Sequence, residues 1–135
     1  MKRNQPVLLI NLENRPERLI HTLSELRKVN MNEYVTRIEA CNEQYAKDKM
    51  FQYITNRAFQ NIRNIQNTMI IPNFRALACA ISHIKCWKFI LKNQYNGCFI
   101  TEDDIVITKP EEFQFEIEQV KKLIKNSSNT SKDIF

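Results

Sequence analysis

The chain has 135 residues, a length that favours one folded domain spanning residues 1–135. Hydrophobic residues make up 43% of it, which excludes a wholly disordered chain, and its single glycine excludes collagen-like or linker-like repeats. The net charge of +5 comes from scattered basic residues, so the sequence predicts no nucleic-acid-binding surface and is compatible with an anionic ligand.

The cysteines form no CxxC pair and no zinc-type cluster with histidine; they are Cys41, Cys79, Cys86 and Cys98. Free thiols, at least partly buried and in a reducing compartment, are the simplest interpretation. The apolar stretch that begins at Val7 has only about six residues, too short for a signal-peptide core or a membrane span. We therefore expect a cytoplasmic protein with no transmembrane segment.

The first forty residues predict a strand, a helix and a second strand. Residues 7–12 form a continuous apolar run, which is typical of a buried strand. Pro16 suits the first turn of a helix, and apolar residues follow at helical spacing as far as Val29. Residues 34–40 form the second predicted strand. This succession indicates a parallel α/β unit.

Residues 42–73 are the least regular part of the sequence. Five apolar residues there fit one helical face among many asparagines and glutamines: Phe51, Ile54, Ala58, Ile62 and Ile65. A surface helix and a mobile loop both remain open for this segment. From Leu77 to Leu91 the pattern predicts a helix that is apolar over most of its circumference, with Cys79, Cys86 and Trp87 in the core.

The last part of the chain predicts a strand followed by a helix. Residues 98–101 are expected to be a short central strand, and residues 105–107 to continue as an edge strand. Residues 110–126 predict a helix with one apolar face, formed by Phe113, Ile117, Val120 and Ile124. Three lysines are expected near its C-terminus, where the helix dipole favours cations: Lys121, Lys122 and Lys125. Ile134 and Phe135 resemble the start of a further strand.

The strongest chemical signal is the run Glu102-Asp103-Asp104, at the carboxyl end of a predicted strand. Ligands bind at such ends in open α/β sheets, and oxygen donors suit Mg²⁺ or Mn²⁺. Residues two apart on an extended chain point the same way, so Glu102 and Asp104 would face one ion while Asp103 turns aside. The alternative is a solvated acidic turn, and spacing alone does not decide between them.

Two further groups of polar residues are candidates for the same site. Arg15 and Arg18 follow the first strand at helical spacing, where guanidinium groups can hold phosphate. On these residues alone, an ordinary surface pair bridged to Glu17 or Glu25 is the more frequent arrangement. Ser82 and His83 interrupt an apolar helix, and a histidine there is more often a satisfied, partly buried residue than a catalyst.

Taken in chain order, five pieces of the sequence resemble glycosyltransferase family 25, over most of the chain. They are Ile10-Asn-Leu12, the pair Arg15 and Arg18, Ile38-Glu-Ala40, Ala80-Ile-Ser-His83 with Trp87, and Phe99-Ile-Thr-Glu-Asp-Asp104. The family contains lipooligosaccharide galactosyltransferases and procollagen galactosyltransferase-like proteins. The order and spacing of the pieces are far more specific than any single one.

The resemblance implies a GT-A-like, Rossmann-type parallel sheet with flanking helices, and transfer of galactose or glucose from a UDP-sugar to a hydroxyl acceptor. The acceptor would be a glycan or a hydroxylysine-type group. Glu102 and Asp104 would hold Mn²⁺ or Mg²⁺. Binding of the donor would fall to Asn11, Arg15, Arg18 and Asp103. His83 matches a Ser-His pair of the family and is the candidate catalytic residue.

Family members continue well past the acidic motif, into a half that would carry the acceptor site and the general base. We therefore expect a partial domain, truncated after the motif, that transfers sugar poorly alone and associates through an uncovered sheet edge. One alternative is a non-catalytic module or subunit that binds nucleotide sugars. A response-regulator-like domain is a weaker alternative, since it needs a further acid pair after the first strand, and the sequence has none.

Overall fold

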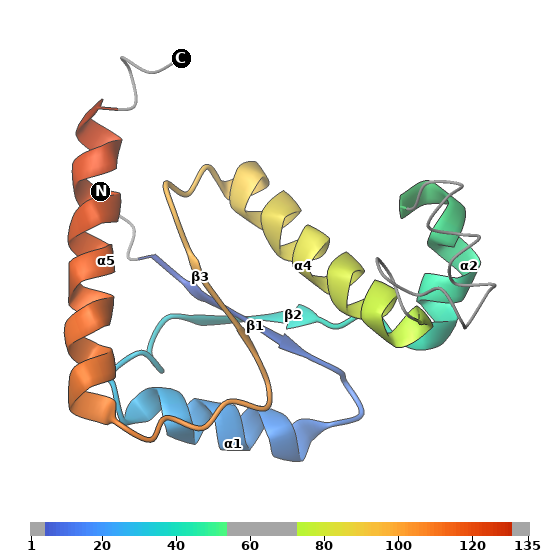
Figure 1. The fold of residues 1–135 in the computed structure, drawn as a ribbon, viewed down its shortest axis with the longest axis horizontal. Coiled ribbons are helices and arrows are strands. Elements are labelled where there is room, and N and C mark those ends of the chain that lie inside the picture. Colours follow the sequence, from blue (N-terminus) through green and yellow to red (C-terminus); the bar gives the residue numbers. More distant parts are fainter. Residues whose placement is uncertain (1–4, 54–72, 131–135) are drawn as a thin grey trace.

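The computed structural model describes residues 5–53 and 73–130. They form a parallel three-stranded sheet with helices packed around it (Figure 1). The strands are β1 (Val7–Asn11), β2 (Val35–Glu39) and β3 (Phe99–Glu102), in the order β2-β1-β3. The predicted parallel α/β fold is confirmed. The expectation that the strand after residue 98 is central is wrong for the described sheet, because β1 lies between the other two and is buried along its whole length.

The helices are α1 (Pro16–Arg27), α2 (Glu43–Tyr53), α4 (Phe74–Asn93) and α5 (Pro110–Thr130). Three of them confirm helices that the sequence predicts, and α2 shows that the irregular segment begins as a helix. The rest of that segment, with Ile54, Ala58, Ile62 and Ile65, lies outside the described residues, as do Ile134 and Phe135.

Helices cover both faces of the sheet (Figure 1). Val7 and Leu9 of β1 pack in one cluster with Leu26 of α1, whereas the even-numbered residues of β1 pack in another with Cys86 of α4. Successive side chains of a strand point to opposite faces, so a continuous apolar run is what a strand between two helical layers needs. This arrangement explains why β1 has no alternation of apolar and polar residues.

The helix α4 is less enclosed than its apolar sequence predicts. Cys86 is buried as expected, but Cys79 is exposed and Trp87 is 54% exposed, so the expectation that all three are core residues is wrong for two of them. Among the described elements, the helix packs against the sheet and against α2. All four cysteines are free thiols, as the sequence predicts, but the expectation that all are at least partly buried is wrong for Cys79.

The segment that follows β3 is held by side chains of α1 rather than by a strand. The ring Nε2 of His21 lies 3.0 Å from the carbonyl oxygen of Ile105, and the N–H of Ile107 donates to Glu25 at 2.9 Å. Residues 105–107 therefore form no edge strand, contrary to expectation. Their backbone groups are satisfied by α1 instead of by a neighbouring strand.

The helix α5 touches the core at few positions. Ile117 is buried, whereas Phe113 and Val120 of its predicted apolar face are exposed. A Cβ at Gly97, the only glycine, would come within 3.1 Å of Ile124, so the absence of a side chain lets α5 approach the start of β3. The helix continues to Thr130, and the three lysines expected at its C-terminus precede the last turn.

Glu25 joins α1 to the segment after β3. Besides the N–H of Ile107, its carboxylate accepts a hydrogen bond from Nζ of Lys28 at 2.8 Å. The hydrogen bond from Lys28, followed by that from Ile107, lowers the pKa of Glu25 below its usual value of 4.5, against a smaller opposing effect of burial. A lowered native pKa means that the ionised carboxylate stabilises the fold.

We expect Glu25→Gln to lower the urea midpoint of unfolding at pH 7. The difference in midpoint between variant and parent should have its full size above pH 4.5. It should disappear as the pH falls through the lowered pKa of the native Glu25 carboxyl, because both proteins are then uncharged at this position. Glu118→Gln is the matched control, since Glu118 also pairs with a lysine three residues later but is exposed. A difference that is the same at every pH would contradict this account.

Candidate functional site at the carboxyl ends of the strands

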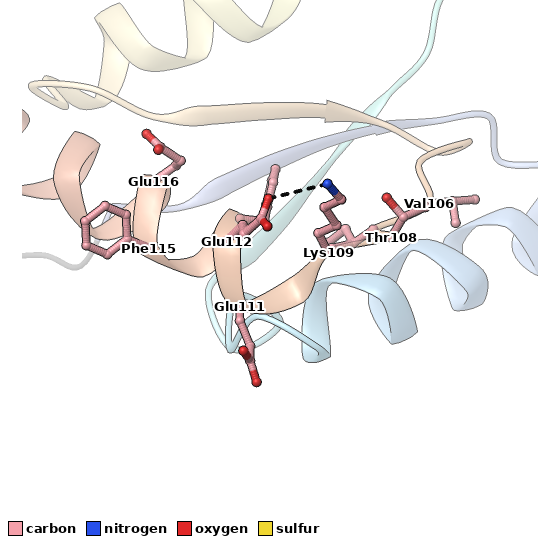
Figure 2. A pocket seen from close by; sticks show the side chains of 9 residues that line it. Val106, Thr108, Lys109, Glu111, Glu112, Phe115 and Glu116 are labelled. Carbon is pink, nitrogen blue, oxygen red and sulfur yellow. Dashed lines mark ion pairs between the residues drawn. The ribbon is translucent and has the colours of Figure 1, made fainter.

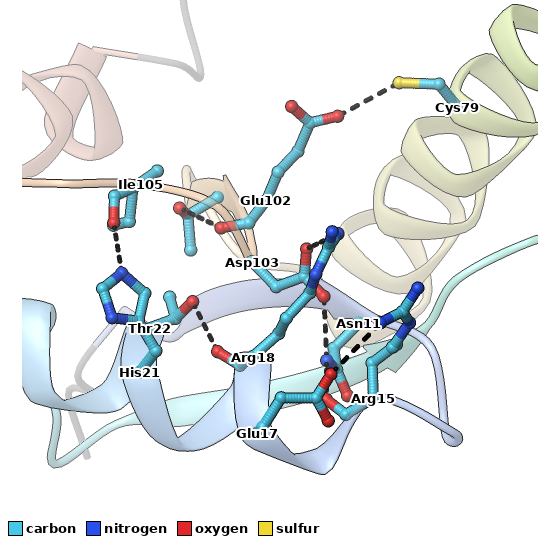
Figure 3. Close-up of polar contacts among 11 residues, drawn as sticks. Asn11, Arg15, Glu17, Arg18, His21, Thr22, Cys79, Glu102, Asp103 and Ile105 are labelled. Carbon is cyan, nitrogen blue, oxygen red and sulfur yellow. Dashed lines mark hydrogen bonds and ion pairs between the residues drawn. The ribbon is translucent and has the colours of Figure 1, made fainter.

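The acidic turn, residues 102–104, lies where the carboxyl ends of β1 and β3 meet (Figure 3). Ile10 pairs in register with Glu102, so Asn11 and Asp103 follow side by side and share a hydrogen bond. The sequence prediction that the acids lie beside the first loop is confirmed. This edge is where ligands bind in open parallel sheets.

Glu102 and Asp103 of the turn point to opposite sides of the sheet (Figure 3). The carboxylate of Glu102 faces α4 and accepts a hydrogen bond from Sγ of Cys79 at 3.1 Å. The carboxylate of Asp103 faces α1, where it accepts from Nδ2 of Asn11 at 2.9 Å and lies 3.6 Å from Arg18. Asp103 therefore turns aside from Glu102, as strand alternation predicts.

Asp104 lies beyond the strand, in the turn, so alternation does not set the direction of its side chain. Its electrostatic effect nevertheless reaches α4. The hydrogen bond to Glu102 raises the pKa of the Cys79 thiol to about 11, and burial and the charges of Glu102 and Asp104 add to the rise. Both Glu102 and Asp104 are exposed to solvent, whereas the side chain of Asp103 is only 14% exposed.

Asn11 connects the elements that surround the site. It is 2% exposed, and its amide group donates to the carbonyl of Arg15 at 3.0 Å as well as to Asp103. Its side-chain oxygen accepts from Nε of Arg37 at 3.0 Å. Because Arg37 only donates and the carboxylate of Asp103 accepts, the two neighbours fix the orientation of the amide.

The two arginines of the first loop have different partners. Arg18 pairs with Asp103, whereas Arg15 lies 3.4 Å from Glu17, the surface pair that the sequence left open. Both guanidinium groups are about half exposed, at the N-terminal turn of α1. Positive side chains and the positive end of the helix dipole therefore occupy the α1 side of the acidic turn.

Sequence reasoning missed Arg37, which also contacts this edge. Arg37 donates to both the side-chain oxygen and the carbonyl of Asn11, and it pairs with Glu39. The sequence feature that could have indicated it is the spacing of Arg37 and Glu39. They are two residues apart near the end of a strand, so their side chains lie on one face. Only the parallel pairing of β1 with β2 shows that this face is the one that carries Asn11.

Ser82 and His83 have separate roles. The buried hydroxyl of Ser82 accepts from the N–H of Cys41 at 2.8 Å and donates to the carbonyl of Ala78, so it fastens the chain after β2 to α4. The next residue, His83, has a side chain that is 34% exposed, and its Nε2 lies 3.8 Å from Oε1 of Glu102. The structure thus brings His83 to the acidic turn and places Ser82 in the packing of the fold.

A hollow of about 740 Å³ lies at a different place, beside the first turns of α5 (Figure 2). Exposed Val106 and Phe115 contribute to its walls, together with three acidic side chains, Glu111, Glu112 and Glu116. Lys109, 3.8 Å from Glu112, is the lysine in this wall. A wall with this excess of carboxylates repels an anionic ligand, whereas the acidic turn has two arginines beside it.

Comparison with known proteins identifies the family. The model of glycosyltransferase family 25, described as an LPS biosynthesis protein, matches residues 4–133. The chain belongs to glycosyltransferase family 25. The resemblance that the sequence shows from Ile10 to Asp104 is thereby confirmed, and the parallel sheet with flanking helices agrees with the Rossmann-type fold expected of such a family.

Two other comparisons gave no match to this family 25 member, one with curated proteins and one with solved structures. Within residues 5–53 and 73–130, no helix has both the length and the apolar character needed to cross a membrane.

We expect Asn11→Asp to destabilise the protein by about 2–4 kcal/mol, because a carboxylate cannot donate to the carbonyl oxygen of Arg15 and it repels Asp103. Urea unfolding at pH 7 measures the change. Asn14→Asp adds the same charge three residues further along, at an exposed position, and should change stability by no more than about 0.5 kcal/mol. Equal effects of the two substitutions would show that charge, and not the hydrogen bonds of Asn11, matters.

Proposed function

We propose that this family 25 chain transfers a hexose, galactose or glucose, from a UDP-sugar to a hydroxyl group on a glycan or on a hydroxylysine-type acceptor. The observation that carries the proposal is the acidic turn at the ends of β1 and β3, beside the arginine-bearing N-terminus of α1. This juxtaposition combines ligands for a cation with groups that bind phosphate. The free thiols support a cytoplasmic location.

The α1 side of the turn is suited to the donor diphosphate. Arg15 and Arg18 have half-exposed guanidinium groups that can make charge-assisted hydrogen bonds to phosphate oxygens. Asp103 holds the guanidinium of Arg18 near the sheet, and Asn11 holds Asp103. In this proposal Asn11 and Asp103 position the first loop for the donor.

The α4 side of the turn is suited to a hard divalent cation, Mn²⁺ or Mg²⁺. Glu102 and Asp104 offer exposed carboxylate oxygens, whereas Asp103 is engaged by Asn11 and Arg18. Exposed carboxylates fit ions that keep several water ligands and also bind a diphosphate. When bound, the ion would neutralise charge that develops on the UDP leaving group.

The acceptor hydroxyl must lose a proton, and His83 is the candidate base. Its imidazole is partly exposed and lies at the turn, with Nε2 near the Glu102 carboxylate. A histidine is suited to this role because its ordinary pKa lies near neutrality. Glu102 would orient the ring, and the adjacent Ser82 keeps this turn of α4 in place.

We expect UDP-galactose or UDP-glucose to bind at least about tenfold more tightly with Mn²⁺ than with a chelator, a difference of about 1.4 kcal/mol. Asp104→Asn should remove this dependence because it removes one of the two ligand charges. Titration calorimetry measures both affinities. Glu111→Gln, which removes an exposed acid on α5, is the control and should retain the metal effect. Equal affinity with metal, with chelator and in Asp104→Asn would refute the proposal.

Release of UDP in the presence of hydroxyl acceptors separates transfer from binding alone. We expect a slow acceptor-dependent release, which Asp104→Asn abolishes and His83→Asn lowers by about 10²–10⁴-fold without weakening donor binding. Metal-dependent donor binding with no release, across a panel of glycan and hydroxylysine acceptors, would instead identify the chain as a non-catalytic module that binds nucleotide sugars.

A further inference from the structure

Three side chains of different chemistry converge on the α4 side of the acidic turn. Cys79 and His83 are four residues apart on α4, so they lie on one face of the helix, and Glu102 reaches them from β3. Sγ of Cys79 lies 3.1 Å from Oε1 of Glu102, and Nε2 of His83 lies 3.8 Å from the same oxygen. One ligand atom from each residue lies within 4.8 Å of the other two.

These separations are close to those around a tetrahedral metal ion. With zinc–ligand bonds of about 2.0–2.3 Å, neighbouring ligand atoms of a tetrahedron are about 3.3–3.6 Å apart. The distances of 3.1 and 3.8 Å from Glu102 lie just below and just above this range, and the ligand atoms of Cys79 and His83 lie within 4.8 Å of each other, so side-chain rotations could complete the site. Two of the ligands come from consecutive turns of one helix, which holds them in place before an ion binds.

The donor set selects the kind of metal. A thiolate and an imidazole favour zinc over the harder Mg²⁺ and Mn²⁺, which prefer oxygen ligands. Cys79 is exposed and His83 partly so, which gives a cation access from solvent. The thiol of Cys79 donates its proton toward Glu102, where the ion would lie between the two side chains. When a sulfur–metal bond forms, this proton is released to water.

We propose that Cys79, His83 and Glu102 form a zinc site with three protein ligands and a fourth position open to water. The site goes beyond sugar transfer, because it would bind Zn²⁺ whether or not the chain is an enzyme. Glu102 also belongs to the proposed Mn²⁺ or Mg²⁺ site and His83 is the proposed base, so Zn²⁺ would compete for that carboxylate and block the base. That consequence, unlike the zinc site itself, rests on the proposed function.

The other thiols of the chain cannot take part in this site. Cys41 and Cys86 are buried in two separate apolar clusters, and Cys98 packs beside Cys86. The second histidine, His21, lies on α1 and contacts Ile105. These residues therefore provide matched controls, because each substitution removes a thiol or an imidazole away from the three ligands.

Cobalt(II) titration of the full chain tests the proposal, since Co²⁺ occupies zinc sites and reports thiolate ligands by a sulfur-to-metal absorption band. We expect this band in the parent, with tetrahedral visible bands, and its loss on addition of Zn²⁺. Cys79→Ser should abolish it. His83→Asn and Glu102→Gln should weaken Zn²⁺ binding at least tenfold, measured against a chromophoric chelator, because even the loss of a group that only supports a metal ligand costs roughly 10–100-fold.

Cys98→Ser and His21→Gln should retain the band and the affinity. Circular dichroism of each variant confirms that it is folded, which is expected for Cys79→Ser because Cys79 is exposed. Absence of the band in the parent, its persistence in Cys79→Ser, or its loss in folded Cys98→Ser would overturn the proposal. The titration contains no donor or acceptor, so a negative result leaves the proposed sugar transfer untouched.

Discussion

The candidate site depends on the hydrogen bonds of one buried side chain, that of Asn11. One amide at the end of the central strand bonds to Arg37 of β2, to the carbonyl of Arg15 at the start of α1, and to Asp103 after β3. Both N–H groups of the amide donate and its oxygen accepts inside the protein, where an unmatched polar group would be costly. The strand ends and the first helix therefore keep one relative arrangement, and the acidic turn is presented in one geometry.

Burial of β1 on both faces is the second constraint. Apolar side chains alternate between the clusters under α1 and α4, and the parallel pairing carries the same alternation into β3. Glu102 therefore falls on the α4 face, whereas Asp103 falls on the α1 face. A shift of β3 by one residue in register against β1 would exchange these directions. The packing of the core thus decides which acid meets which partners.

The two sides of the acidic turn consequently offer different chemistry. On the α1 side, Asp103 is neutralised by Arg18, next to a helix N-terminus suited to phosphate. On the α4 side, Glu102 stands with a thiol and an imidazole, and the charge of Asp104 adds to its effect on that thiol. The proposed sites for an anionic donor and for a cation would therefore lie on the two sides of one short segment.

The sequence by itself determined the strands, most of the helices and the family, because apolar periodicity and motif order are local properties of the chain. It also located the acids at a strand end beside the first loop. Only the tertiary structure decided that β1 is central, that residues 105–107 bond to α1, and that Arg37 and Cys79 join the site. These facts depend on the order of the strands and on contacts between segments that are distant in the sequence. A pattern of neighbouring residues cannot predict either of them.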